Sequence, residues 1–158
     1  MENFKHYPQT TELDTSWQRL IALAIEKLPN AYAPYSNFLV SAALLMDDDT
    51  IVFGTNQENA AYPSGLCAER VAVFAAQSQQ PHKKILRIAI VAKPATGQEL
   101  ASGASCGACR QVMLEAEYRQ QQPIEIVMLT AKDRWTIAPS AESLLPFAFN
   151  KKNLISHY

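Results

Sequence analysis

Three cysteines and one glutamate are the residues of this sequence best suited to carry out chemistry. Cys67 stands in the stretch GLCAER, two residues before Glu69, and Cys106 and Cys109 stand in SCGACRQ; the 158 residues contain no other cysteine. Two thiols separated by two residues can converge on one metal ion where a loop becomes a helix. Taken alone, such a pair also suits a redox couple or two small buried residues, so these alternatives stay open.

The third cysteine favours a metal site. An odd number of cysteines does not fit a disulfide framework within a monomer, and free thiols are typical of a reducing compartment. Three thiolates leave one position of a tetrahedral zinc ion open for water, as in catalytic rather than structural zinc sites. We expect the histidines to be solvated surface residues rather than ligands, because they lie in polar or terminal segments: His6, His82 and His157.

An open zinc site needs a base beside its water molecule, and Glu69 is placed for that role. It follows Cys67 by two residues at the expected start of a helix, and the apolar sequence VAVFAA that follows argues against a simple surface glutamate. Helix N-termini also present unpaired N–H groups and the positive end of the helix dipole, which stabilise thiolates.

The remaining elements must bring the two cysteine stretches together. Apolar periodicity predicts helices over 67–79 and 106–120, and apolar runs predict a hairpin of 38–46 with 51–56. Further strands are predicted at 85–92, 124–129 and 135–138, a first helix begins near Asp14, Thr15 or Ser16, and a short helix is expected at 140–146. This order predicts an α/β fold with three layers, α/β/α, in which helices cover both sides of a mixed sheet of about five strands.

Composition limits the partners of the chain. The formal net charge is −1 and no run of Lys or Arg exceeds a pair, so we expect no nucleic-acid partner. The polar start and the absence of a long apolar run predict a soluble, cytoplasmic protein without a membrane partner. We expect residues 1–13 to form a flexible N-terminal arm and residues 14–158 to form a single catalytic domain.

Four motifs together resemble the zinc-dependent cytidine deaminases of the small, homotetrameric type. CAER with CGACRQ is similar to the family's zinc motif, and GTNQENAAYPSGLCAER is similar to its GxNxENAxYPxGxCAER. YAPYSNFLVSAAL resembles its YSxFxVGAAL, and LLPFAF resembles its terminal LLPxxF, so the resemblance extends from Tyr32 to Phe149. It implies hydrolytic deamination of cytidine and 2′-deoxycytidine to uridine and 2′-deoxyuridine, with release of ammonia, in pyrimidine salvage.

The resemblance implies a role for each residue of the reacting centre. One zinc ion per chain would be held by Cys67, Cys106 and Cys109. Glu69 would take a proton from the zinc-bound water, pass it to ring nitrogen N3 and help to protonate the departing amine, while hydroxide attacks C4. Arg70 would donate hydrogen bonds to the thiolates and partly neutralise their charge, the alternative being a surface ion pair.

The resemblance also implies the contacts to the nucleoside. Asn56 and Glu58 would hold the ribose 3′-hydroxyl, and Phe38 would pack against the base. The backbone N–H of Ala68 would meet the pyrimidine carbonyl. Tyr35 and Tyr62 match positions near the nucleoside, the alternative being half-buried packing tyrosines.

The terminal motif implies that the active sites are shared between subunits. Phe149 of one subunit would stack on the base bound to another, so the working unit would be a homotetramer. The alternative is that Phe147 and Phe149 fold back onto their own core.

Two positions depart from the family pattern. Ser105 stands where the family usually has proline, which restores a backbone N–H, and Ser41 stands where its strand usually has glycine. We expect both to affect efficiency and substrate preference rather than the reaction.

Three other functions remain as alternatives. One is deamination of another aminopyrimidine nucleoside, such as a nucleoside antibiotic, or of a free base; NQEN argues for a ribose. Another is editing of cytosine in RNA or DNA, against which the near-neutral charge argues. The last is a non-catalytic zinc module, which leaves Glu69 and the missing fourth ligand unexplained.

Overall fold

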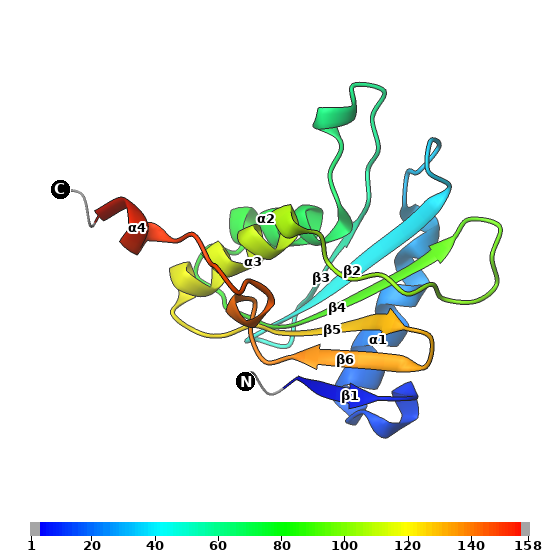
Figure 1. Cartoon of the computed structure of the whole chain (residues 1–158), viewed down its shortest axis with the longest axis horizontal. Coiled ribbons are helices and arrows are strands. Elements are labelled where there is room, and N and C mark those ends of the chain that lie inside the picture. Colours follow the sequence, from blue (N-terminus) through cyan, green and yellow to red (C-terminus); the bar gives the residue numbers. More distant parts are fainter. Residues whose placement is uncertain (1–3, 156–158) are drawn as a thin grey trace.

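A mixed sheet of six strands forms the centre of the molecule (Figure 1). The computed structural model describes residues 4–155. Neighbouring strands follow the order β1-β6-β5-β4-β2-β3, and among them β4 and β5 pair in parallel while the other pairs are antiparallel. The elements are β1 Lys5–Tyr7, α1 Thr15–Lys27, β2 Phe38–Met46, β3 Ile51–Thr55, α2 Ala68–Gln79, β4 Ile85–Pro94, α3 Gly107–Gln120, β5 Glu125–Ala131, β6 Arg134–Ala138 and α4 Lys151–Ile155.

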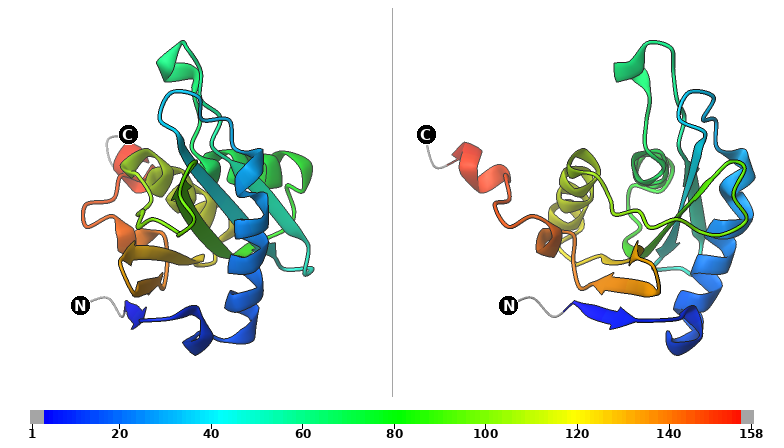
Figure 2. Two further views of the ribbon diagram at one scale, coloured as in Figure 1. Left: turned by 90° about the vertical axis from the view of Figure 1, so that its right-hand side faces the viewer. Right: turned by 45° about the vertical axis from the view of Figure 1, so that its right-hand side comes forward.

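Helices cover both faces of the sheet, which gives the molecule three layers (Figure 2). On one face, Trp17 of α1 and Val91 of β4 belong to the same buried cluster. On the other face, Val73 of α2, Met113 of α3 and Ile88 of β4 belong to a second buried cluster. This arrangement confirms the predicted α/β fold with helices on both sides of a mixed sheet.

Strand β2 lies inside the sheet, between β3 and β4, and both of its faces are covered. Leu44 belongs to the cluster under α2 and α3, whereas the adjacent Ala43 belongs to the cluster under α1. A strand covered on both faces has no need of polar alternation, which explains the continuous run FLVSAALLM. Ser41 is fully buried in this strand, and its hydroxyl finds no hydrogen-bond partner in the described part of the chain.

Gly54 allows α2 to approach the sheet closely. A Cβ atom on Gly54 would lie 2.3 Å from the carbonyl oxygen of Ala68 and 2.4 Å from the backbone nitrogen of Ala72. Any side chain at this position would therefore push α2 away from β3. The first turn of α2 begins directly after Cys67 and contains Glu69. The contact at Gly54 therefore fixes how far these two residues lie from the sheet.

The N-terminal segment supplies the sixth strand. Residues 5–7 form β1, which pairs with Trp135, Thr136 and Ile137 of β6, and Leu13 is buried. Residues 4–13 therefore differ from the flexible arm that we expected, while residues 1–3 lie outside the described part of the chain. A strand of three residues shows no periodicity, and its hydrogen bonds come from pairing with β6.

The ends of the helices show further detail. Asp14 is the N-cap of α1, because its side chain accepts a hydrogen bond of 2.9 Å from the backbone N–H of Trp17. In place of the short helix expected at 140–146, a single 3₁₀ turn spans Glu142–Leu144, and α4 was not predicted.

No helix in residues 4–155 combines the length and apolar character needed to cross a membrane.

Candidate active site and metal centre

The three cysteines converge where α2 and α3 begin. Cys67 and Cys106 are the N-cap residues of α2 and α3, and Cys109 lies in the first turn of α3. The two helices contact each other on one face of the sheet (Figure 1), which places their first turns close together. As a result, the three Sγ atoms all lie within 4.8 Å of one another, as the sequence predicts.

The distance between two of the sulfur atoms matches that between two ligands of one zinc ion. Cys67 Sγ and Cys106 Sγ are 3.9 Å apart. A tetrahedral zinc ion with Zn–S bonds of about 2.3 Å holds its sulfur ligands about 3.8 Å apart. Among residues 4–155, no histidine or carboxylate joins this cluster: His6 contacts Thr136 Oγ1 at 3.0 Å, and His82 lines a separate hollow. His157 lies outside the described residues. The donor set thus leaves a fourth position for water or substrate.

The surroundings of the cluster favour a thiolate at Cys67. Hydrogen bonding from the Cys109 thiol, followed by that from the Arg70 guanidinium, lowers the pKa of Cys67 to about 5. The contact with Cys67 in turn raises the pKa of the buried Cys109, because two thiols this close do not readily ionise together. Arg70 Nη2 donates to Cys67 Sγ at 3.7 Å, as the sequence predicts. A divalent cation bound between the sulfur atoms would offset the electrostatic repulsion between neighbouring thiolates.

Glu69 is a buried carboxyl group next to the cysteine cluster. Glu69 is only 4% exposed, and burial raises the pKa of its carboxyl group. Glu69 Oε1 accepts a hydrogen bond of 2.8 Å from the hydroxyl of Ser105, which is also buried. An acidic side chain is rarely buried without such a partner. The carboxyl group is therefore held in one place, at the side of the thiols.

A cleft of about 270 Å³ brings six of the predicted residues together. Its lining includes Phe38, Asn56, Glu58 and Glu69, together with the two N-cap cysteines. These residues come from β2, from the segment after β3 and from the starts of α2 and α3. The cleft therefore places an amide and two carboxyl side chains next to two of the three thiols.

Asn56 and Glu58 shape one wall of this cleft. Asn56 Oδ1 accepts from the N–H of Val40 at 2.8 Å, and its Nδ2 donates to the carbonyl of Phe38 at 2.9 Å. Glu58 Oε2 accepts from the backbone N–H groups of Tyr35 at 2.9 Å and Ser36 at 3.2 Å. Hydrogen bonding with Ser36 is the main cause that holds the pKa of Glu58 below its usual range, so it is a carboxylate at neutral pH.

Ala68 is the first residue of α2 and is fully buried. Its N–H is one of the first four of the helix, which have no acceptor within the helix itself. This places a donor next to Cys67 and Glu69.

Tyr62 and Phe149 are not brought into the cleft by their own chain. Tyr62 is 85% exposed and lines an adjoining hollow that it shares with Asn56, Glu58 and Arg70. Phe149 is 58% exposed, and its carbonyl accepts from Gln111 of α3 at 2.8 Å. Phe147 is 99% exposed, so neither phenylalanine folds back onto its own core.

Two contributors to the site were missed by sequence reasoning. The prediction for Ser105 concerned its backbone, whereas the structure shows its hydroxyl on Glu69. Arg110 Nε donates to the carbonyl of Ser105 at 2.8 Å and thereby fixes the loop before α3. The position of Arg110 directly after CGAC was the only signal, because nothing in the spacing shows which carbonyl its side chain reaches.

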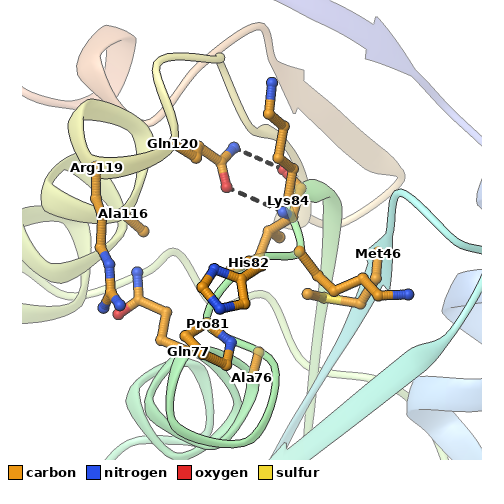
Figure 3. Close-up of a pocket in the computed structure, with 11 residues that line it drawn as sticks. Met46, Ala76, Gln77, Pro81, His82, Lys84, Ala116, Arg119 and Gln120 are labelled. Carbon is orange, nitrogen blue, oxygen red and sulfur yellow. Dashed lines mark hydrogen bonds between the residues drawn. The ribbon is translucent and has the colours of Figure 1, made fainter.

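A second hollow, of about 220 Å³, lies at the other ends of α2 and α3 (Figure 3). Its lining includes His82, Lys84 and Arg119, and Gln120 closes one side by hydrogen bonds to both backbone groups of Ile85. The C-terminal ends of both helices face this hollow, and their partial negative charge partly offsets the positive charge of the basic side chains. It lacks the convergent chemistry of the cleft at the cysteines.

Comparisons with known proteins agree with this geometry. The family model described as the cytidine and deoxycytidylate deaminase zinc-binding region matches residues 14–122. A cytidine deaminase of Sporosarcina psychrophila is 38% identical over 140 residues, covering 87% of this chain and 93% of that protein. A cytidine deaminase of Halalkalibacterium halodurans is 47% identical over 98 residues, covering 62% of this chain and 70% of that protein. The crystal structure of cytidine deaminase from Burkholderia pseudomallei superposes with a TM-score of 0.70 at 38% identity, covering 84% of this chain and 98% of that chain.

Proposed function

The chain belongs to the cytidine and deoxycytidylate deaminase family, and we propose that it hydrolyses cytidine and 2′-deoxycytidine to uridine and 2′-deoxyuridine with release of ammonia. The strongest support for this proposal is the arrangement of side chains in the cleft. The buried Glu69 lies beside three convergent thiols, in the same cleft as Asn56 and Glu58. No feature of the described residues favours another aminopyrimidine over these nucleosides.

Cys67, Cys106 and Cys109 would hold the zinc ion. Zinc, when bound, activates water as a nucleophile by lowering its pKa from above 15 to about 7 in favourable sites. Three thiolates weaken this effect because they give the site a net negative charge. The hydrogen bond from Arg70 to Cys67 Sγ and the N-termini of two helices partly offset that charge.

Glu69 would move the protons. It would accept a proton from the attacking water, deliver it to N3 of the pyrimidine ring, and later help to protonate the departing amine at C4. Such general acid–base steps are worth about a hundred- to ten-thousand-fold each. Burial keeps Glu69 away from bulk water, so a proton that it accepts is retained for the substrate.

The other cleft residues would select and orient the nucleoside. Asn56 can donate to and accept from a sugar hydroxyl, and the carboxylate of Glu58 can accept from it. Both side chains are fixed by hydrogen bonds to the backbone of residues 35–40, which reduces the cost of ordering them on binding. Phe38 would pack against the base, and the N–H of Ala68 would meet the pyrimidine carbonyl.

A homotetramer with shared sites would complete the cleft. Phe147, Phe149 and Tyr62 are exposed on segments that extend from the domain, and such apolar exposure is typical of an interaction surface. In this arrangement Phe149 and Tyr62 reach the nucleoside bound to a neighbouring subunit. The free thiols of the metal site suit a cytoplasmic location, which belongs to the same proposal.

The proposal is tested by the loss of the ultraviolet band of the aminopyrimidine. Cytidine, 2′-deoxycytidine and cytosine are compared side by side with the same zinc-loaded protein. We expect turnover of both nucleosides and little turnover of the free base, because the base lacks the sugar that Asn56 and Glu58 would hold. Turnover of cytosine alone, or of none of the three, would contradict the proposal.

A further inference from the structure

Ser105 is held from three sides in the interior of the molecule. It is 3% exposed, and its backbone N–H donates to Met128 Sδ of β5 at 3.3 Å. Its carbonyl accepts from Arg110 Nε at 2.8 Å, and Arg110 Nη1 in turn donates to the carbonyl of Leu144 at 3.1 Å. With the backbone fixed from both sides, the hydroxyl is aimed at Glu69 Oε1, which it reaches at 2.8 Å.

We propose that Ser105 is a positioning residue for Glu69, whose hydroxyl fixes the carboxyl group in the orientation that its proton transfers require. The inference rests on the proposed function in one respect, namely that Glu69 is the base. A glutamate side chain rotates about three bonds, so a fixed donor at one oxygen removes much of that freedom. General acid–base catalysis depends on this placement, because the proton must pass over one hydrogen-bond length.

The supporting frame does not depend on the metal. Met128 comes from the central sheet and Arg110 from the second turn of α3, and both contact the backbone of Ser105 rather than a thiol. Proline, which the family usually has here, offers neither the N–H that contacts Met128 nor the hydroxyl that contacts Glu69. This chain therefore holds its base in a way that the usual family sequence does not allow.

A merely structural role is the competing explanation, because a buried hydroxyl needs a hydrogen-bond partner wherever it lies. Such a role predicts loss of stability without a specific effect on turnover. A positioning role predicts the reverse: turnover falls while the fold and the zinc content stay unchanged.

Two matched pairs of proteins separate the explanations. The wild type and Ser105→Ala differ in the hydroxyl at the native size of the side chain. Ser105→Thr and Ser105→Val share one larger shape and differ in the hydroxyl, which is a methyl group in Val. We expect kcat for cytidine to fall about ten-fold or more in Ser105→Ala, with KM and zinc content unchanged. We expect Ser105→Thr to exceed Ser105→Val by a similar factor. Ser102→Ala, the same change at an exposed serine of the same loop, serves as the control and should match the wild type.

A second readout is independent of turnover. Crystal structures of the zinc-loaded wild type and Ser105→Ala should show one orientation of the Glu69 carboxyl group in the former and several in the latter. If the wild type fails to deaminate nucleosides, the proposed function falls, and the orientation of Glu69 still decides the role of Ser105. Wild-type kcat in Ser105→Ala, or an unchanged single orientation of Glu69 in that variant, would overturn the inference.

Discussion

One methyl group added at Gly54 should disturb the active site through the packing of α2 alone. The Cβ atom of Gly54→Ala would lie 2.3 Å from the carbonyl oxygen of Ala68 and 2.9 Å from the Cβ atom of Ala72. Both neighbours belong to the first two turns of α2, and two of the closest atoms are backbone atoms that no rotamer change can move. The first turn of the helix must therefore shift away from the sheet, and Cys67 and Glu69 shift with it.

The size of the effect follows from the distances. Restoring ordinary van der Waals contact requires a shift of about 1 Å at Ala68. Overpacking of this kind typically costs about 1–3 kcal/mol of folding stability. Misplacement of catalytic groups by about 1 Å lowers the rate roughly a hundred-fold. We therefore expect a protein that still folds but has lost most of its turnover, since Cys106 and Glu69 no longer keep their spacing.

The assay compares kcat for cytidine, zinc content and thermal unfolding in Gly54→Ala and the wild type. Gly97→Ala is the matched control, because the three atoms nearest to a Cβ atom there belong to the side chain of Pro94, at 3.2 to 3.3 Å, in the loop after β4 rather than in α2. The control should keep the wild-type kcat. Wild-type turnover and stability in Gly54→Ala would refute the argument that this contact sets the position of the site.

Three further predictions address individual residues. Cys106→Ser should reduce bound zinc well below one ion per chain and abolish turnover; elemental analysis checks this, and an active protein free of metal would contradict it. Glu58→Ala should raise KM for cytidine about ten-fold while zinc stays bound, because a sugar contact is lost but no proton transfer; Glu58→Gln, which keeps an acceptor oxygen, should be affected less, and equal kinetics in all three proteins would disprove the contact. Mixing inactive Glu69→Gln chains with inactive Phe149→Ala chains should restore part of the activity after subunit exchange, because an intact Glu69 site can then meet an intact Phe149; no recovery despite proven exchange would exclude shared sites.

The sheet and its helices could be predicted because their apolar residues recur with a clear period. The runs at β2, β4 and β5 are long and buried on both faces, and α2 and α3 follow cysteine motifs that mark a loop passing into a helix. Strand β1 could not be predicted, since three residues carry no period and their place in the sheet comes from pairing with β6. The same reason applies to α4, a helix of five residues at the C-terminal end.

The cluster of thiols was predictable because both motifs place their cysteines at helix starts. The contact between Ser105 and Glu69 was not, because it joins residues 36 positions apart through a rotamer that the sequence does not specify. The proposed role of Phe149 depends on a second copy of the chain. The backbone of one chain leaves this side chain exposed, so the match at LLPFAF was the only signal for it.

The most direct test of the account measures ammonia release from cytidine by the wild type and by Glu69→Gln, each with its zinc content determined. Gln has nearly the same shape as Glu but cannot accept and deliver the proton. We expect both proteins to bind about one zinc ion per chain, as the three-thiol cluster requires. The wild type should release one ammonia for each uridine formed, and Glu69→Gln should lose turnover at least about a hundred-fold. Retention of more than about a tenth of the turnover by Glu69→Gln would contradict the assignment of Glu69 as the proton carrier, and no ammonia release by the zinc-loaded wild type would contradict the proposed reaction itself.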